Sequence, residues 1–523
     1  MPTLTIDNQS VTVPEGTMLL EAAAQVGVKI PTLCHRPDLT ALVGCMICVV
    51  REDASGRMLP SCATPAAEGM RISTASAEVL AMRRSLLELL LSTHVADCEA
   101  PCQFACPCHF DIPVMLGQIA VRDDAAALAT VLARLALPVT LGHICPAPCE
   151  KVCRRAVIDA PVAICAVKRF SGEQGAFVPA SVADTGKRVV VVGAGPTGLS
   201  AAFYLRLQGH TCHVLEATAQ VGDALLANVT GRLPSAAHAQ DVARIRALGV
   251  TFAVGSPLHP ADAVRMLADA DAMVLTAGTA SASIAEALGI PVQKGCVVVD
   301  KQTHQSANSK VFSGGGAIQS CRIAVLACAH GRVLAENLHA WLTMGKTTAT
   351  TQDRFQSRAG KLSREMLTGL LVDAADGGRL LPAAGGTQPE ALDAGMLRDE
   401  ARRCLHCACL KQKNCQFRAL CTESRTAAPV FSGERAPPAR VHAQPDVVFE
   451  AAKCVLCGIC VRTAAGMGAA CGPAFHGRGF DMQIGPPVGR MWAEVPREVM
   501  LACVQACPTG ALAAAYGPVS SER

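Results

Sequence analysis

Cysteine is the residue type in this chain with the greatest capacity for chemistry, because 27 of the 523 residues are cysteines. All but four of them fall into four blocks, which span residues 34–62, 98–165, 404–421 and 454–507. The first residues show no basic segment followed by an apolar run, so we expect no secretory signal and a cytoplasmic location. Thiols in that compartment rarely form disulfides, and their clustering favours metal binding, with iron–sulfur clusters as the first interpretation.

The first block predicts a 2Fe–2S cluster. Its cysteines lie in IPTLCHRPDLTALVGCMICVV and LPSCATPAAEGM, at Cys34, Cys45, Cys48 and Cys62. Two irons that share two sulfides each need two further thiolates, which a loop and a distant strand can supply. LTIDNQSVTVPEG and TMLLEAAAQVG, which come before, predict a hairpin and a helix. A structural zinc ribbon, the alternative, would call for two C-x2-C pairs.

This block resembles the N-terminal ferredoxin domain of the large iron–sulfur subunit of NADH dehydrogenase (complex I), which also occurs in formate dehydrogenases and NAD-linked hydrogenases. The resemblance implies a β-grasp 2Fe–2S domain over residues 1–76.

The second block begins with HVADCEAPCQFACPCHFDIP, in which His94 precedes cysteines at four-residue spacing. We interpret His94 as a ligand because it heads this regular series, and the complex I subunit carries a similar His-then-three-Cys cluster. The block continues in LGHICPAPCEKVCRRAVIDAPVAICAVKRF. With CPCHFDIP, this segment resembles the helical two-cluster domain of the glutamate synthase small subunit and dihydropyrimidine dehydrogenase, which implies such a domain over 77–180.

In that family the two 4Fe–4S clusters interleave. The resemblance implies a first ligand set of His94, Cys98, Cys102 and Cys153, and a second that includes Cys106, Cys145 and Cys149. The family's fourth ligand of the second cluster is Gln or Glu, but the aligned residue here is Lys168, a poor ligand while protonated. We favour Cys165, one helical turn earlier on the same face, and note that Cys108 is also near.

KRVVVVGAGPTGLSAAFYLRLQGHTCHVLEA predicts a strand, a glycine-rich turn, a helix and a second strand that ends in an acid. This order is typical of dinucleotide binding, with the pyrophosphate at the helix N-terminus and the acid on a ribose hydroxyl. The predicted contact residues are Gly193, Gly195, Gly198 and Glu216.

The glutamate synthase family binds FAD in such a domain, which the resemblance places at 181–345. Asp223 and Gly316 depart from its flavin pattern. The family's second nucleotide domain, for NADPH, is missing between DAMVLTAGT and GCVVVDKQTHQSANSKVF. We therefore expect no NAD(P)H binding at the usual site, and a flavin that is an internal relay or idle.

The two C-terminal blocks predict one 4Fe–4S cluster each. A linker is expected over 346–400. The segment 401–425 that follows has four candidate ligands within twelve residues, Cys404, Cys407, Cys409 and Cys415. Zinc is the alternative occupant of this set. KCVLCGICVRTAAG and CVQACPTGAL resemble the halves of a two-cluster ferredoxin, over 446–523. There the fourth cysteine of each half ligates the other half's cluster. Ala464 replaces one such cysteine, so the complete set is Cys454, Cys457, Cys460 and Cys507.

The whole sequence predicts a multidomain α/β and α+β protein: a β-grasp ferredoxin, a helical iron–sulfur domain, an FAD-type Rossmann-like domain and a ferredoxin-like C-terminal domain. Lys and Arg number 47 against 43 Asp and Glu, and aromatics are 3%, so nucleic acid is not an expected partner. The uncharged stretches are better explained by the nucleotide turn and a metal-binding loop than by a membrane span.

We expect one 2Fe–2S cluster, up to four 4Fe–4S clusters and FAD, with no catalytic residues. The function predicted is electron transfer in a soluble oxidoreductase complex that resembles formate dehydrogenase, hydrogenase or NADH dehydrogenase. By resemblance, the partners are a catalytic molybdenum, tungsten or hydrogenase subunit and an NADH-binding flavoprotein or a ferredoxin-linked protein. The alternatives are a self-contained NAD(P)H-dependent flavoenzyme like the glutamate synthase small subunit, and a zinc-stabilised assembly scaffold.

Overall fold

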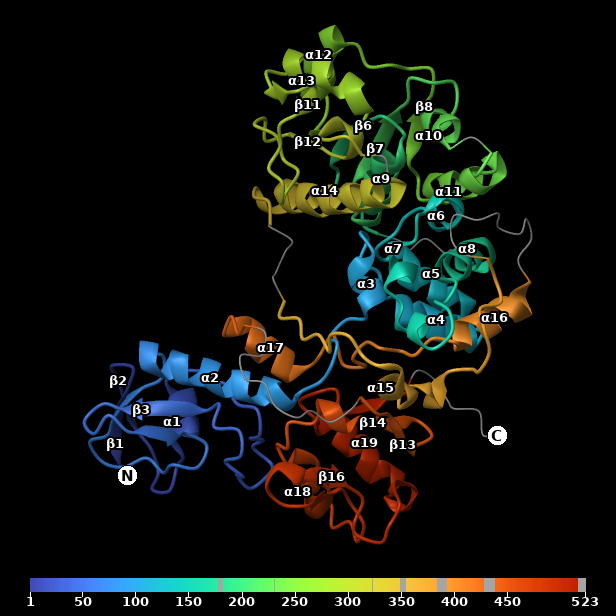
Figure 1. Ribbon diagram of the computed structural model, residues 1–523. Helices are drawn as coiled ribbons and strands as arrows, with labels where there is room; N and C mark the ends of the chain where they lie inside the picture. The colour runs from blue at the N-terminus through green and yellow to red at the C-terminus, as the bar shows by residue number, and fades with distance from the viewer. Residues whose placement is uncertain are drawn as a thin grey trace. The chain divides into compact units, whose positions relative to one another are not determined.

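The computed structural model describes residues 1–176, 182–229, 231–321, 323–348, 354–382, 393–427 and 438–515. These residues form two compact units (Figure 1). The first combines Met1–Ala100, Asp353–Asp373 and His406–Arg523, and the second combines Pro101–Gln352 and Ala374–Leu405. Each unit therefore joins segments that lie far apart in the sequence. No helix in the described ranges is long and apolar enough to cross a membrane.

The N-terminal part of the first unit has the β-grasp fold. Its sheet has the order β2-β1-β5-β3-β4, in which β1 and β5 are parallel and the other neighbours are antiparallel. The strands are β1 (Thr3–Ile6), β2 (Gln9–Thr12), β3 (Val49–Glu52), β4 (Met58–Pro60) and β5 (Arg71–Ser73). Leu19 and Ala22 of α1 (Leu19–Gln25) pack in the same core as Leu4 and Ile6. The predicted hairpin and helix are confirmed.

The rest of the first unit consists of α2 (Ala77–Thr93) and the C-terminal segments. β14 (Val447–Phe449) is the central strand of a small antiparallel sheet, between β13 (Val441–Gln444) and β17 (Leu512–Ala514). Val447, Met500 and Leu512 share its core. The remaining elements are α15 (Arg364–Thr368), η4 (Leu371–Asp373), α17 (Gln416–Glu423), η5 (Ala451–Lys453), α18 (Ile459–Gly466), β15 (Ala474–His476), η6 (Gly479–Asp481), β16 (Gln483–Gly485), η7 (Trp492–Glu494) and α19 (Arg497–Ala506).

Short helices make up the cysteine-rich part of the second unit. Asp111 and Asp123 cap two of them, because each carboxylate accepts a hydrogen bond from a backbone N–H in the first turn. The helices are α3 (Pro101–Ala105), α4 (Ile112–Ala120), α5 (Asp124–Leu132), α6 (Pro138–Ile144), α7 (Pro148–Lys151), η1 (Arg154–Val157) and α8 (Ile164–Gln174). α16 (Ala394–Arg402) packs on α4 and α8.

A parallel sheet of order β12-β9-β6-β7-β8 forms the Rossmann-like part of the second unit, as predicted. Its strands are β6 (Arg188–Val192), β7 (Thr211–Leu215), β8 (Thr251–Ala253), β9 (Ala272–Leu275) and β12 (Val311–Ser313). α9 (Pro196–Leu207) packs along α14 (Ala324–Met344) beside the sheet (Figure 1). The other elements are α10 (Asp223–Asn228), α11 (Ser235–Ala247), α12 (Pro260–Ala268), η2 (Gly278–Ala280), α13 (Ser281–Ala287), β10 (Val292–Gln293), β11 (Cys296–Val297) and η3 (Gly315–Ala317).

Candidate functional site

The cysteines of the first block gather in two pairs on the β-grasp domain. Cys34 is hydrogen-bonded to Cys45, and Cys48 to Cys62. All four thiols are buried, and the loop between them turns through left-handed backbone at Val43 and other positions. Hydrogen bonding from the paired thiol lowers the pKa of Cys34 to about 5 and that of Cys48 to about 6. The same hydrogen bonds raise the pKa of Cys45 and Cys62, so one thiol of each pair is the readier to ionise. Two adjacent pairs of thiols are what two irons of a 2Fe–2S cluster need.

The cysteines chosen by the crossed ferredoxin pattern line one cavity in the C-terminal part of the first unit. These are Cys454, Cys457, Cys460 and Cys507. Gly458, with φ of 64°, turns the chain in the left-handed region between two of them, and the Leu456 N–H donates to the Cys454 sulfur at 3.4 Å. Cys503 lies instead in the apolar core and is fully buried. The cavity and its four thiols fit a 4Fe–4S cluster.

The His94 series divides between the two units. His94 and Cys98 lie in the first unit, whereas Cys102 and Cys153 lie in the second. In the first unit, His94 and Cys98 line one cavity with Cys409 and Cys415 of the third cysteine block. Burial and the nearby Lys453 lower the pKa of His94 to about 4, so its imidazole is neutral near pH 7. The third block divides as well, because Cys404 belongs to the second unit and Cys407 to the first.

In the second unit, the ammonium group of Lys168 interacts electrostatically with four thiols. They belong to Cys106, Cys145, Cys149 and Cys165. Cys165 is hydrogen-bonded to both Cys145 and Cys149, and it receives a hydrogen bond from Lys168 Nζ at 3.8 Å. Burial works against the charge on Lys168, but the facing thiolates raise its pKa above the usual value. The four thiols fit a 4Fe–4S cluster with Cys165 as its fourth ligand.

Cys108, the other residue considered for that place, is hydrogen-bonded to Cys106, one of these four cysteines. Its thiol is fully buried and donates to the carbonyl of Val325 at 3.4 Å, near the start of α14.

The glycine-rich turn has the shape that a dinucleotide requires. Gly193 has φ of 101°, and a Cβ on Gly198 would lie 2.0 Å from the Gly193 oxygen, so both positions need glycine. A Cβ on Gly195 would meet no atom within 4 Å, which leaves room for a pyrophosphate at the start of α9. Glu216 is buried and accepts hydrogen bonds from the N–H groups of Ala194 and Thr218, at 2.8 and 2.9 Å. The turn therefore fits FAD.

The two departures from the flavin pattern lie in folded, closely packed places. Gly222, which precedes Asp223, has φ of 84° and lies against the buried ring of His238. The first glycine of the family's Gly-Gly pair therefore has the left-handed backbone that favours glycine. A Cβ on Gly316 would be in ordinary contact with Gly278, at 3.6 Å. The space beside Gly316 is therefore not filled by another side chain.

Substitutions in the turn separate packing from cofactor binding. Gly198→Ala is expected to destabilise the second unit by about 1–3 kcal/mol, because its methyl group would collide with the Gly193 carbonyl. Gly195→Ala should keep the fold and lose flavin, because its methyl group would occupy only the space of the pyrophosphate. Thermal unfolding and released flavin measure the two effects. Full flavin content in Gly195→Ala would contradict this assignment of the turn.

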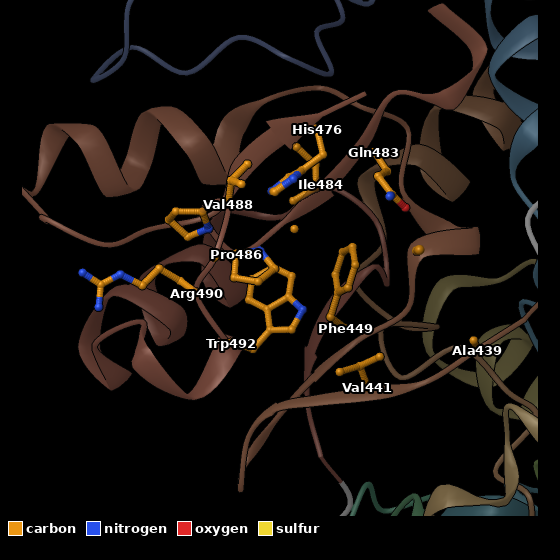
Figure 2. A pocket seen from close by; sticks show the side chains of 14 residues that line it. Ala439, Val441, Phe449, His476, Gln483, Ile484, Pro486, Val488, Arg490 and Trp492 are labelled. Atoms are coloured by element: carbon orange, nitrogen blue, oxygen red, sulfur yellow. The ribbon is translucent and has the colours of Figure 1, made fainter. Parts of the chain in front are cut away.

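A further cavity of about 460 Å³ opens beside β14 and the segment 486–492 (Figure 2). Phe449 and Trp492, whose ring centroids are 5.0 Å apart, form one wall, and His476 and Gln483 lie opposite. None of the predicted ligand cysteines lines this cavity, so it is not a cluster site.

Comparison with known families shows three redox domains in succession. The "2Fe-2S iron-sulfur cluster binding domain" matches residues 1–77, "Dihydroprymidine dehydrogenase domain II, 4Fe-4S cluster" matches 92–176, and "Pyridine nucleotide-disulphide oxidoreductase" matches 165–331. The chain is a fusion of these domains. These three parts of the fusion predicted from sequence are thus confirmed, as are the cofactor types 2Fe–2S, 4Fe–4S and FAD.

Among curated proteins, the chain is similar to the beta subunit of NADP(+)-dependent formate dehydrogenase from Moorella thermoacetica, with 35% identity over 29% of this chain and 26% of that one. It is 44% identical to the NADP-reducing hydrogenase subunit HndD of Solidesulfovibrio fructosivorans, over 19% and 18% of the two chains. It is 30% identical to the NAD-dependent dihydropyrimidine dehydrogenase subunit PreT of Escherichia coli O157:H7, over 35% and 47%. The chain thus spans less than half the length of each of these relatives.

Among solved structures, the chain is similar to a NAD+-reducing [NiFe]-hydrogenase in the H2-reduced state. The identity is 36%, over 18% of this chain and 39% of that chain, with a TM-score of 0.17.

Residues next to the cysteines also build these sites, and the sequence analysis did not identify them. Arg462 donates to the Cys34 carbonyl at 2.6 Å and to the Cys457 carbonyl at 3.3 Å. Thr509 donates to the Lys453 carbonyl at 3.0 Å. The position of Thr509 directly after Cys507-Pro508 is a signal that could have pointed to it, whereas nothing in the local pattern marks Arg462.

Proposed function

We propose that this chain is an electron-relay subunit of a cytoplasmic oxidoreductase complex. It carries one 2Fe–2S cluster, up to four 4Fe–4S clusters and FAD, and it passes electrons between a catalytic subunit and an NADH-binding flavoprotein or a ferredoxin-linked partner. The observation that carries this proposal is the gathering of cysteines into several separate buried sites within one chain, each at a place where the fold supplies hydrogen bonds around the sulfurs.

Adjacent sites within the first unit support a relay. Arg462 bridges the 2Fe–2S loop and the C-terminal site, because its guanidinium donates to carbonyls of Cys34 and Cys457. One side chain therefore spans the two sites, which places the proposed redox centres next to each other. No side chain of the acid, base or nucleophile type is needed for this role.

The region between β9 and β12 supports flavin rather than pyridine nucleotide as the bound dinucleotide. Residues 276–310 hold only η2, α13 and the short strands β10 and β11. A second nucleotide-binding domain would need its own parallel sheet and glycine-rich turn. Electrons would therefore enter or leave the chain through other proteins.

The relatives support the same class of partner. The matched proteins are subunits of a formate dehydrogenase and of a NADP-reducing hydrogenase. We infer a catalytic subunit of one of these kinds, with molybdenum, tungsten or a hydrogenase centre, as the partner of this chain.

Anaerobic quantification of iron, acid-labile sulfide, zinc and released flavin tests the proposal. We expect at most about 18 irons per chain, the number for one 2Fe–2S and four 4Fe–4S clusters, together with about one flavin; three 4Fe–4S clusters would give about 14 irons. Dithionite should produce EPR signals, and NADH alone should not bleach the protein. Zinc in place of iron would leave the assembly scaffold as the explanation, and rapid bleaching by NADH or NADPH would favour the self-contained flavoenzyme.

A further inference from the structure

We propose that His94, Cys98, Cys409 and Cys415 together hold one 4Fe–4S cluster, so that its ligands come from two segments more than 300 residues apart. This inference rests on the proposed function, since it requires that the chain carries iron–sulfur clusters. It replaces two expected ligand sets: the one with Cys102 and Cys153, which the resemblance implies, and the one confined to the third cysteine block, which spacing predicts.

The four side chains line the same cavity in the first unit. A parallel β-bridge joins Asp97 to Ala408, and the Cys409 N–H donates to the Asp97 carbonyl at 3.0 Å. Because Cys98 follows Asp97 and Cys409 follows Ala408 in the sequence, this pairing brings the two cysteines together. Phe417 closes the cavity, with its ring edge-on to His94 at a centroid distance of 5.3 Å. The site is therefore made by tertiary pairing of distant segments.

One hydrogen bond fixes the orientation and the tautomer of the His94 ring, so that the ring can act as a ligand. His94 Nδ1 lies 3.1 Å from the carbonyl oxygen of Lys453, which can only accept, so Nδ1 carries the proton. The Nε2 lone pair is then free to bind iron, which is the usual arrangement of a metal-bound histidine held by a backbone carbonyl. The side chain is 7% exposed, so its ring has little freedom to turn away.

The sulfurs of the site accept hydrogen bonds from the backbone. The Ser357 N–H donates to Cys98 Sγ, and the Arg418 N–H donates to Cys415 Sγ, each at 3.4 Å. Such bonds stabilise thiolates and are typical of cluster ligands. Gly510 lies against the third sulfur, since a Cβ at this position would be 2.2 Å from Cys409 Sγ.

Arg418 ties together the segments that build the cavity. Its guanidinium is buried and donates to Glu99 at 2.7 Å. It also donates to the carbonyls of Phe355 and Gln412, both at 2.9 Å. Because these partners come from three separate stretches of the first unit, Arg418 is a positioning residue for the site and supplies a buried positive charge beside it.

A short series of polar contacts joins this site to the C-terminal one. The Lys453 carbonyl accepts from both His94 Nδ1 and Thr509 Oγ1, at 3.1 and 3.0 Å. Thr509 Oγ1 lies 3.7 Å from Cys507 Sγ. A ligand of one cluster is thus connected to a ligand of the next through one carbonyl and one hydroxyl, which places the histidine-bound cluster inside the relay.

Nitrogen hyperfine spectroscopy of the full chain, reduced anaerobically with dithionite, tests the proposal. We expect one EPR species with ¹⁴N coupling from His94. Cys409→Ser and Cys415→Ser should each abolish or alter that species, and loss of the cluster would remove about four irons. Cys102→Ser and Cys153→Ser should leave it unchanged. Cys421→Ala, a buried cysteine on α17 that does not line the cavity, is the matched control.

His94→Cys covers the case in which a serine variant fails to fold. It should keep the full iron content, lose the ¹⁴N coupling and shift the same species to a lower potential, because a thiolate adds one negative charge. The proposal is overturned if the coupling depends on Cys102 or Cys153 and not on Cys409 or Cys415, or if the clusters of the unaltered protein show no histidine coupling. A protein without iron and sulfide would instead overturn the proposed function.

Discussion

Lys168→Met is expected to lower the midpoint potential of the cluster at Cys106, Cys145, Cys149 and Cys165 by about 100 mV. Lys168 is buried, its ammonium group donates to Cys165 Sγ at 3.8 Å, and it interacts electrostatically with the other three cysteines. Reduction adds one negative charge to the cluster, and the ammonium group stabilises that charge. At an effective dielectric constant of roughly 20 and a mean separation of roughly 7 Å, the interaction is about 2.4 kcal/mol, which corresponds to about 100 mV for one electron.

A redox titration followed by EPR measures the shift. Methionine keeps the length of the lysine stem, so the substitution removes the charge with little change in packing. Lys151→Met is the matched control, because this exposed lysine lies on α7 close in sequence to Cys149. Solvent screens an exposed charge, so its shift should be below about 20 mV. Equal shifts in the two variants would show that Lys168 does not act through its buried position.

Glu400→Ala is expected to reduce the free energy of opening of α16 by about 3–5 kcal/mol. The Glu400 carboxylate is fully buried and accepts from Arg403 Nη1 at 2.6 Å. It also accepts from the N–H groups of Ala163 and Leu380, both at 2.8 Å. Alanine would leave a buried guanidinium group and two backbone donors without this acceptor, which is among the most costly changes in a protein interior.

This network holds the part of the chain around Cys404 onto the helical iron–sulfur domain. Arg155 donates to the Arg403 carbonyl at 3.1 Å, and Arg403 donates to Asp159 at 2.8 Å. Native-state hydrogen exchange of α16 and α8 measures the effect. Asp399→Ala on the same helix breaks an exposed pair with Arg402 and should cost less than about 0.5 kcal/mol. A similar small effect for Glu400→Ala would mean that other contacts hold α16 in place.

Local spacing was sufficient for those sites whose residues lie in one or two short loops. Cys34 pairs with Cys45 and Cys48 with Cys62, and the crossed ferredoxin set lines a single cavity. The glycine turn and Glu216 also lie where the sequence places them. In each case a short loop or one strand–turn–helix unit limits which residues can come into contact. The spacing of the residues in the sequence is therefore enough to predict which of them share a site.

Only the tertiary structure decided which distant residues share a site. The resemblance implies that His94 and Cys98 share a ligand set with Cys102 and Cys153, but His94 and Cys98 line a cavity with Cys409 and Cys415. That arrangement depends on the bridge between Asp97 and Ala408 and on the three partners of Arg418. Likewise, the sequence marks Lys168 only as a poor ligand, whereas the fold brings its charge close to four cysteines. Pairing of remote segments is set by the sum of packing and hydrogen bonds over the whole unit, which spacing within one segment does not encode.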